Sequence, residues 1–267
     1  MNSKLKNYFR DLMPERYQVP VKFYYNRIQS RLEPELDILR YLVSENDLTV
    51  DVGGNRGIYA YKLWQLGAKV EVFEPNPECS RVLEVWAESK PRVNIHSAAL
   101  SRQVGSAVLH IPIDGAGVEH SASASIEDTG FSYVRDQEVA LNTLDNYEFE
   151  NVSFIKIDVE GHELSVIEGA YQTLTSSKPA LLVEIEQRHI NRPIHGIFEK
   201  ITSFGFQGFW GGMSGLAPLD KFDVDKHQSM QNFESEQGAY INNFLFLHSD
   251  KLDAGKYENL FSGYKAR

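Results

Sequence analysis

Cysteine is almost absent from this 267-residue sequence, in which Cys79 stands alone. One cysteine cannot form an intrachain disulfide or a cysteine-rich zinc module, and its scarcity fits a reducing cytoplasm. Basic residues are also few, because 27 lysines and arginines face 37 aspartates and glutamates and give a formal net charge of −10. Such a balance disfavours a broad phosphate-binding surface. We therefore expect no nucleic-acid partner.

Long apolar runs, repeats and low-complexity tracts are lacking as well. No segment approaches the roughly 18 consecutive apolar residues of a membrane span. The first 20 residues are mixed and charged, without the apolar stretch of a signal peptide. The sequence predicts a cytoplasmic protein without a membrane span, and it leaves the oligomeric state open. Hydrophobic residues make up 42% of the chain, enough for a sizeable core.

Short apolar runs alternate with segments of helical periodicity after residue 33. We expect strands within 48–52, 69–74, 93–100, 107–113, 138–144, 154–159, 180–187, 206–212 and 240–248. Helices are expected within 34–47, 58–68, 78–90, 163–178 and 193–205. This alternation predicts an α/β domain with a doubly wound, mostly parallel sheet and an antiparallel edge. We divide the chain into an N-terminal arm or cap (1–33), the main domain (34–250) and a C-terminal tail (251–267).

A glycine turn follows the first expected strand, in the segment DVGGNRG. Gly53 and Gly57 allow a tight turn and close backbone approach to a ligand, at the strand end where ligands bind in open α/β sheets. Asp51, at the tip of the strand, can accept a hydrogen bond from a ligand amine. Glu74 ends the next strand, where a carboxylate can hold both hydroxyls of a ribose.

The spacing of this turn differs from the dinucleotide fingerprint G-x-G-x-x-G. Asn55 occupies the middle position and the last glycine comes one residue early, which disfavours a pyrophosphate cradle. A compact turn of this kind favours S-adenosylmethionine, whose amino-acid end needs less room. A nicotinamide-dependent oxidoreductase and a non-catalytic nucleoside-binding domain are the alternatives.

The segment FIKIDVEGHE, residues 154–163, carries charges through an otherwise apolar strand. Lys156, Asp158 and Glu160 are two residues apart and therefore share one face. Buried charges are costly unless they are paired or functional. Asp158, at the carboxyl end of the strand, is the first candidate for a general base. Lys156 is expected to neutralise Asp158, or Glu184 and Glu186 on the neighbouring strand.

Successive motifs of the chain resemble the FkbM-type S-adenosylmethionine-dependent methyltransferases. They are VDVGGNRGIYA, VEVFEPNP, AALS, NTLDN, FIKIDVEGHELSVIEGA, PALLVEIE and NNFLFL, spread over residues 35–248. The resemblance implies a Rossmann-like class I methyltransferase fold with a mostly parallel, seven-stranded sheet. It also implies O-methylation of a sugar, polysaccharide or secondary-metabolite hydroxyl. The family turn is usually G-A-N-x-G, so Gly54 replaces an alanine here, a change that we expect to be harmless.

The resemblance and the turn together give the expected site. The cofactor-binding residues are Asp51, Gly53, Gly54, Asn55, Gly57, Glu74, Pro75, Ala98, Ala99 and Asp158, with the two alanines near the adenine. The catalytic candidates are Asp158, His162, Glu160 and Lys156. His162 could act as a base or simply face solvent, and Glu160 could cap a helix or bind the acceptor.

A divalent metal is a further alternative, although it is not favoured. Its ligands would come from Asp158, Glu160, His162, Glu184, Glu186 and His189. No tight ligand motif such as H-E-x-x-H is present.

Two other segments are candidates for contact with the acceptor. The Ser- and Gly-rich stretch 114–136 predicts a long loop that closes as a lid and brings His120, Ser123 and Ser125 to the site, or else stays solvated. Trp210, with the following GGMSG, could form a wall for a sugar ring, although core packing is the stronger interpretation.

Overall fold

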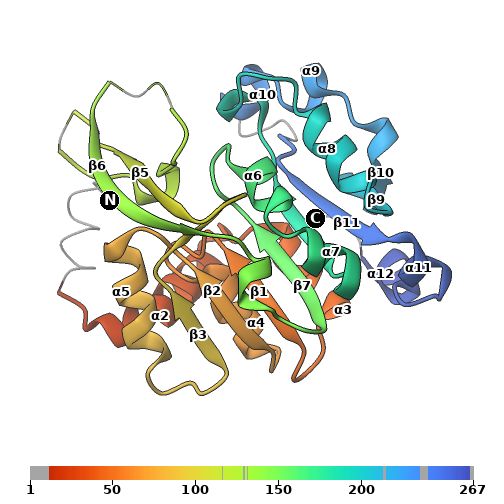
Figure 1. Cartoon of the computed structure of the whole chain (residues 1–267), viewed down its shortest axis with the longest axis horizontal. Coiled ribbons are helices and arrows are strands. Elements are labelled where there is room, and N and C mark those ends of the chain that lie inside the picture. The colour runs from red at the N-terminus through yellow and green to blue at the C-terminus, as the bar shows by residue number, and fades with distance from the viewer. Residues whose placement is uncertain are drawn as a thin grey trace.

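The computed structural model describes residues 12–115, 117–128, 130, 132–212, 215–234 and 240–264. A central eight-stranded sheet has the order β10-β9-β11-β8-β7-β1-β2-β3 and is covered by helices on both faces (Figure 1). Its strands are β1 (Leu48–Val52), β2 (Lys69–Phe73), β3 (Val93–His96), β7 (Val152–Ile157), β8 (Ala180–Glu184), β9 (Phe206–Gly212), β10 (Gly215–Pro218) and β11 (Asn243–His248).

The pairing within this sheet confirms the predicted doubly wound α/β class. The five strands from β3 to β8 in the sheet order are parallel, while β11, β9 and β10 join antiparallel. The sheet has eight strands rather than seven, because Gly215–Pro218 turns back along β9 and extends the edge. Strand order reverses between β1 and β7, which places a ligand-binding crevice at their carboxyl ends.

The helices complete two apolar cores, one on each face. They are α2 (Glu15–Ile28), α3 (Leu39–Leu42), α4 (Ile58–Gln65), α5 (Pro77–Ala87), α6 (Glu163–Glu168), α7 (Tyr171–Ser177), α8 (His195–Thr202), α9 (Val224–His227), α10 (Met230–Glu234), α11 (Ser249–Asp253) and α12 (Glu258–Gly263). Leu182 packs with the α2 to α5 side, whereas its neighbours Leu181 and Val183 pack with the α6 to α8 side. This alternation is the two-residue period of a strand that is buried on both faces.

The same period explains the charged residues of the expected strand 154–159. Phe154 belongs to the core under α4, so Lys156 two residues later faces the same side and is fully buried. Asp158 follows just beyond the end of β7, at the rim of the sheet. The charges therefore form one line from the core to the crevice.

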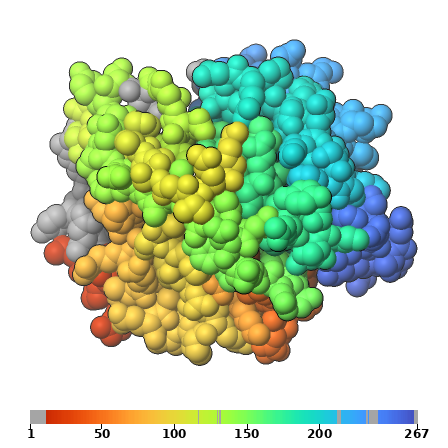
Figure 2. Space-filling model, viewed as in Figure 1, coloured from red at the N-terminus to blue at the C-terminus, as the bar shows by residue number. Residues whose placement is uncertain are grey.

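A second, three-stranded sheet with the order β4-β6-β5 stands beside the central one. Its strands are β4 (Ala99–Leu100), β5 (Gly105–Pro112) and β6 (Val134–Asn142). The expected single strand 93–100 is therefore divided between the two sheets, and the expected loop 114–136 ends in the first residues of β6. The short 3₁₀ turn Ser121–Ser123 lies between β5 and β6. In the space-filling view these strands (yellow to light green) and helices α8 to α10 (teal to blue) form the two upper parts of the molecule (Figure 2).

Two helical segments differ from their predicted form. Residues 34–47 contain a 3₁₀ turn, Pro34–Asp37, and the short α3 rather than one helix. The expected helix 163–178 is divided into α6 and α7 near Gly169. A Cβ atom at Gly169 would lie 2.0 Å from the carbonyl oxygen of Ser101, so this glycine permits a close backbone contact with the segment after β4. Among the described residues, no helix is both long and apolar enough to cross a membrane.

The helix α2 packs on the main domain instead of standing apart as an arm. Its Val19 and Phe23 are 1% and 3% exposed and join the core formed with α4 and α5. The ring of Phe23 lies 5.0 Å from that of Tyr61 on α4. The domain boundary at residue 33 stays a prediction.

Replacing Phe23 by alanine tests whether α2 is part of the cooperative domain. We expect Phe23→Ala to lower the free energy of unfolding by about 3 kcal/mol, because a buried aromatic ring is lost and a cavity remains. Tyr25→Ala, on the exposed side of α2, should change it by less than about 0.5 kcal/mol. Urea unfolding would measure both. Equal values for the two variants would show that α2 unfolds independently.

Candidate active site

Three adjoining cavities lie at the carboxyl ends of β1, β2, β7 and β8. The turn cavity, about 280 Å³, is bordered by the glycine turn, α2 and Lys156. The loop cavity lies between Glu74, Pro75 and the segment Ser121–Ile126. The acid pocket is lined by Asp158, Glu160, Gly161, Glu163, Glu184, Glu186 and His189. Asp158 and Glu160 line all three, so they stand where the cavities meet.

The glycine turn packs directly against the end of β7. Gly53 has φ +81°, and a Cβ atom there would lie 1.8 Å from the carbonyl oxygen of Asp158. Gly57 has φ +78° and begins α4, where a Cβ atom would lie 2.8 Å from Leu83 and 3.0 Å from Val19. The first glycine thus brings two strand ends together, and the second lets α4 approach α5 and α2.

Two buried carboxyl groups flank the turn. Glu74 accepts hydrogen bonds from the backbone N–H groups of Asn55, at 2.6 Å, and Asn76, at 2.8 Å. Asp51 is 2% exposed, and its Oδ2 atom has no hydrogen-bond partner within the described structure. Burial raises the pKa of each to about 7; the two backbone N–H groups oppose the shift at Glu74, and the charge of Lys156 opposes it at Asp51.

This arrangement fits the methionine and ribose ends of S-adenosylmethionine. The orphaned oxygen of Asp51 offers an acceptor for an amino group, and each Glu74 oxygen keeps a lone pair for a ribose hydroxyl. Gly53, Gly54, Asn55, Glu74 and Pro75 line the cavities. Gly57, Ala98 and Ala99 are not among the lining residues of the three cavities, and the role of the two alanines near adenine stays a prediction.

Lys156 is held from three sides inside the sheet. Its Nζ atom donates to Oδ1 of Asn243 at 2.9 Å, lies 3.8 Å from Glu184 and stands 5.0 Å above the ring of Tyr59. Burial alone would lower the pKa of Lys156, but the charges of Asp158, Glu184 and other carboxylates outweigh it and raise the pKa. The predicted partner Glu184 is therefore present, whereas Glu186 is neutralised elsewhere.

Asp158 and Glu184 form a carboxyl pair above this lysine. Burial raises the pKa of both, and the charge of Asp158 raises that of Glu184 further. Asn242 Nδ2 donates to the other side of Glu184, at 2.7 Å from Oε1. Since two adjacent carboxylates cannot both ionise cheaply, the pair retains a proton to higher pH than an exposed acid.

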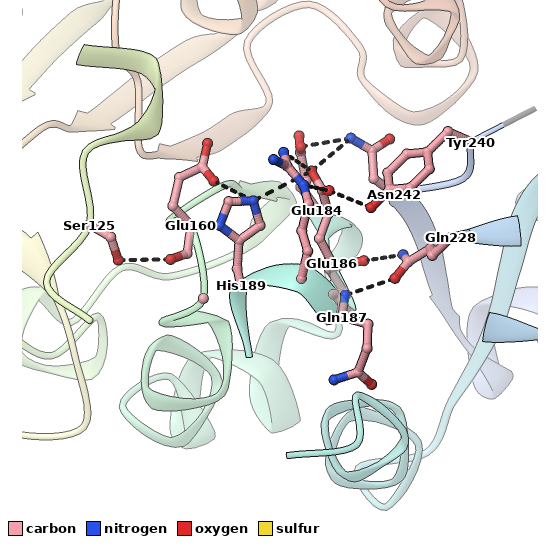
Figure 3. Close-up of polar contacts among 12 residues, drawn as sticks. Ser125, Glu160, Glu184, Glu186, Gln187, His189, Gln228, Tyr240 and Asn242 are labelled. Atoms are coloured by element: carbon pink, nitrogen blue, oxygen red, sulfur yellow. Dashed lines mark hydrogen bonds and ion pairs between the residues drawn. The ribbon is translucent and has the colours of Figure 1, made fainter. Parts of the chain in front are cut away.

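Glu160 and Glu186 approach His189 from opposite sides (Figure 3). Glu160 Oε2 lies 3.2 Å from His189 Nε2, a contact without hydrogen-bond alignment. Glu160 has φ +51°, and burial, with the charges of Asp158 and Glu186, raises its pKa to about 8. Glu160 lines all three cavities, and its role in capping or in acceptor binding stays a prediction.

Glu186 is neutralised by neighbours that follow it in the chain. Arg188 forms a two-point contact with Glu186, with Nη2 at 3.1 Å from Oε1, and Tyr240 donates a hydrogen bond of 2.7 Å. These partners hold the pKa of Glu186 below its usual value despite burial.

One of the two interpretations of His162 was that it faces solvent, and the structure shows instead that it is buried. It is 9% exposed, and both ring nitrogens are engaged, Nδ1 with Glu127 at 2.6 Å and Nε2 with Ser101 at 2.9 Å. To accept a proton from a substrate, the ring would first have to release one of these partners. Its assignment as a base stays a prediction, and the geometry favours Asp158.

The segment between β5 and β6 reaches the site only in part. Ser125 donates a hydrogen bond of 2.7 Å to the carbonyl oxygen of Glu160 and lines the loop cavity. Ser123 and His120 do not line it, and the His120 ring lies 3.4 Å from Asp114. This segment therefore covers the described cavity, whereas lid movement stays a prediction.

Trp210 packs away from the three cavities. Its indole N–H donates to the carbonyl oxygen of Pro218 at 3.1 Å, and its ring lies 4.6 Å from that of His227. Core packing, the stronger interpretation, agrees with these contacts. Met213 and Ser214 of the adjoining GGMSG lie outside the described residues.

The sequence did not indicate several residues that line the site. Lys22 and Asn26 come from α2, and Glu33 follows it, so the expected arm forms one wall of the turn cavity. Glu33 accepts a hydrogen bond of 2.5 Å from the Tyr59 hydroxyl. The four-residue spacing of Val19 and Phe23 was a usable signal for an amphipathic helix, but such a helix does not reveal which face of a domain it covers.

The six candidate metal ligands do not converge on one point in the described structure. Five of the six line the acid pocket, but His162 is turned to Glu127 and Ser101. Across the described ranges, no three histidine, cysteine, aspartate or glutamate side chains are arranged to hold a metal ion.

Comparison with known proteins places the chain in a family. The model of the methyltransferase FkbM domain matches residues 51–207, more than half of the chain. The chain belongs to the FkbM methyltransferase family. The match begins at Asp51 and includes the glycine turn, Glu74 and the charged end of β7.

Two curated relatives are named as methyltransferases. Hexuronic acid methyltransferase AglP of Haloferax volcanii is 30% identical over 149 residues, which cover 54% of this chain and 60% of the relative. The 2-O-methyltransferase NoeI of Sinorhizobium fredii is 26% identical over 194 residues, covering 66% of this chain and 79% of the relative. A solved FkbM methyltransferase from Methylobacillus flagellatus is 16% identical, with a TM-score of 0.49 over 77% of this chain and 44% of that one. The chain thus spans about three fifths of the Haloferax protein.

Gly54 offers a test of how the turn of this family member is packed. A Cβ atom at Gly54 would lie 2.3 Å from Val72 Cγ1, so the alanine that is usual in related turns does not fit beside this valine. We expect Gly54→Ala to lower the free energy of unfolding by about 1–3 kcal/mol through overpacking. Combining it with Val72→Ala should cost less than the sum of the two single changes. Additive costs, measured in a urea double-mutant cycle, would contradict this contact.

Glu160 gives a pH-dependent prediction. Its folded pKa of about 8 exceeds the ordinary 4.5, so its contribution to stability is present below about 4.5 and is lost as pH rises through 8. Glu160→Gln removes this loss and should raise the free energy of unfolding near pH 8.5 by on the order of 2 kcal/mol, with little change near pH 4. Urea titrations of the ligand-free protein across this range would measure it. The exposed control Glu150→Gln should show no such trend.

Proposed function

We propose that this protein is an S-adenosylmethionine-dependent O-methyltransferase acting on a hydroxyl of a sugar, polysaccharide or secondary metabolite. The observation that carries the proposal is the junction of the glycine turn with β7. There Gly53 touches the backbone of Asp158, and the buried carboxyl groups of Asp51 and Glu74 flank the same turn. Membership of a methyltransferase family agrees with this geometry.

The proposed cofactor-binding roles follow from the hydrogen-bond acceptors that remain available in the site. Glu74 would hold the ribose, and Asp51 the amino group, within a turn whose backbone is fixed by Gly53. S-adenosylmethionine supplies a methyl group activated by its positively charged sulfur. A cavity of about 280 Å³ beside the turn is near the lower end of ordinary small-molecule sites.

Asp158 is the proposed proton acceptor. It stands where the three cavities meet, and its raised pKa makes it a stronger base than an exposed aspartate. Glu184, which lines two of these cavities, raises the proton affinity of this site together with burial, while Lys156 stabilises the remaining charge. Glu160 lies beside them and would orient the acceptor.

Exclusion of water is the task of the segment after β5. Ser125 ties this segment to the carbonyl of Glu160, and Ile126 and Ala124 line the loop cavity. Apolar side chains over the cavity keep water from competing with the acceptor hydroxyl and strengthen the electrostatic contacts beneath them.

The names of the two relatives support the proposed acceptor, one through a sugar acid and the other through an oxygen position. One is named for hexuronic acid and the other for 2-O methylation. The nicotinamide-dependent alternative is disfavoured by the glycine spacing, since the turn DVGGNRG lacks the room that a pyrophosphate needs. Fluorescence-detected NADH binding would support that alternative.

Labelled methyl transfer tests the proposal. The purified protein should bind S-adenosylhomocysteine in calorimetry and transfer methyl label from S-adenosylmethionine to a glycan or metabolite fraction of the source cell. Asp158→Asn should reduce the transfer rate by about 10²-fold or more, as expected for loss of a general base. Its dissociation constant for S-adenosylhomocysteine should change by no more than about threefold, since binding rests chiefly on the turn.

The exposed Asp220→Asn serves as the matched control and should retain the parental transfer rate. Absence of S-adenosylhomocysteine binding would overturn the proposed function. Binding of the cofactor without methyl acceptance by any cell fraction would favour the non-catalytic domain.

A further inference from the structure

The acid pocket gathers more carboxyl groups than there are basic side chains beside them. Five carboxyl groups line it, together with His189 and the backbone of Gly161. They come from the end of β7 (Asp158, Glu160), the start of α6 (Glu163), and the end of β8 with the residues after it (Glu184, Glu186). The pocket therefore collects acids from three consecutive elements of the chain.

Two permanent cations form ion pairs with acids of this pocket. Lys156 lies 3.8 Å from Glu184, and Arg188 is paired with Glu186. No lysine or arginine of the described ranges forms an ion pair with Asp158, Glu160 or Glu163. Burial and the charge of Arg188 lower the pKa of His189, so its ring adds no positive charge near neutral pH.

One oxygen in this pocket is buried and lacks a partner. Glu163 is 2% exposed, and its Oε1 atom accepts the backbone N–H of Gly161 at 2.9 Å. Its Oε2 atom has no hydrogen-bond partner within the described structure. A buried carboxylate oxygen without a donor is costly, and it marks a position that a ligand donor can complete.

The pocket is separate from the surfaces that suit the cofactor. Asp51 and Glu74, the two acids that flank the glycine turn, do not line it. It shares Asp158, Glu160 and Glu184 with the turn cavity, and Asp158 and Glu160 with the loop cavity. A group in the acid pocket therefore borders the proposed proton acceptor Asp158 without lying against the two acids that flank the glycine turn.

We propose that the methyl acceptor carries a protonated amino group, as an amino sugar does, and that this ammonium group binds in the acid pocket while a neighbouring hydroxyl faces Asp158. The inference rests on the proposed function and specifies its substrate class. An ammonium group is compact and offers three donors, which suits separated carboxyl oxygens such as those of Glu160 and Glu163. A uronate in the same place would meet like charge.

Sugar binding to the cofactor-loaded protein tests this inference. The probes are the methyl glycosides of glucosamine, N-acetylglucosamine, glucose and glucuronic acid, measured by ligand-observed NMR with saturating S-adenosylhomocysteine, at a pH that keeps the amine protonated. The glucosamine probe should bind with a dissociation constant about tenfold below that of the glucose probe, as expected for a charge-assisted hydrogen bond. Binding of the glucuronic acid probe should be weakest.

Two variants test whether the acid pocket is the source of the tighter binding of the glucosamine probe. Glu163→Gln keeps an oxygen for the Gly161 N–H but cannot ionise against the ammonium group, and Glu160→Gln removes the second group that can. Each should reduce the ratio between the glucose and glucosamine dissociation constants by at least threefold and leave S-adenosylhomocysteine binding within threefold. Glu199→Gln, an exposed change on α8, should leave the ratio intact.

The outcomes separate this inference from the proposed function. If S-adenosylhomocysteine binds but the glucosamine probe has no advantage over glucose, the amine assignment is wrong and the methyltransferase proposal stands. Competition between Mg²⁺ alone and the glucosamine probe would reassign the pocket to a metal ion. Failure of S-adenosylhomocysteine to bind would overturn both.

Discussion

The buried ammonium group of Lys156 is the interaction on which the site depends. It is 0% exposed, and its charge acts on Asp158, Glu184, Glu33 and Asp51, which belong to separate parts of the chain. Without this cation those carboxyl groups would face one another uncompensated in a poorly hydrated crevice. Asn243 and the ring of Tyr59 hold the ammonium group in place. Along β7, Lys156 therefore has a structural role, and Asp158 at the end of the strand has the proposed functional one.

The charge of Lys156 does not compensate all of the buried carboxyl groups around it. The carboxyl groups that remain without a cation give the site its chemical character. Burial raises the pKa values of Asp51, Glu74, Glu160 and Glu163, so the ligand-free protein holds protons that ordinary acids would release. Ligands that bring donors or positive charge would relieve this cost. The buried carboxyl groups thus lower the stability of the ligand-free protein and leave the crevice ready to bind a ligand, a common feature of functional sites.

Contributions from distant segments close the crevice. The helix α2 supplies Lys22 and Asn26 on one side, and Tyr240 and Gln228 brace the residues after β8 on another (Figure 3). The Gln228 side chain bonds to the backbone at Gln187, Ile185 and Ile241, and so fixes the loop that carries Arg188. Segments without a recognisable motif thus set the shape of the site.

The sequence alone determined the alternation of strands and helices, the glycine turn and the line of charges at Lys156, Asp158 and Glu160, because these depend on local spacing and backbone period. It did not determine the partners of those charges. That Lys156 meets Glu184, that His162 is tied to Glu127, and that α2 forms a wall of the crevice follow from contacts between residues far apart in the chain. Tertiary packing decided them, since burial and pairing energies depend on which elements become neighbours.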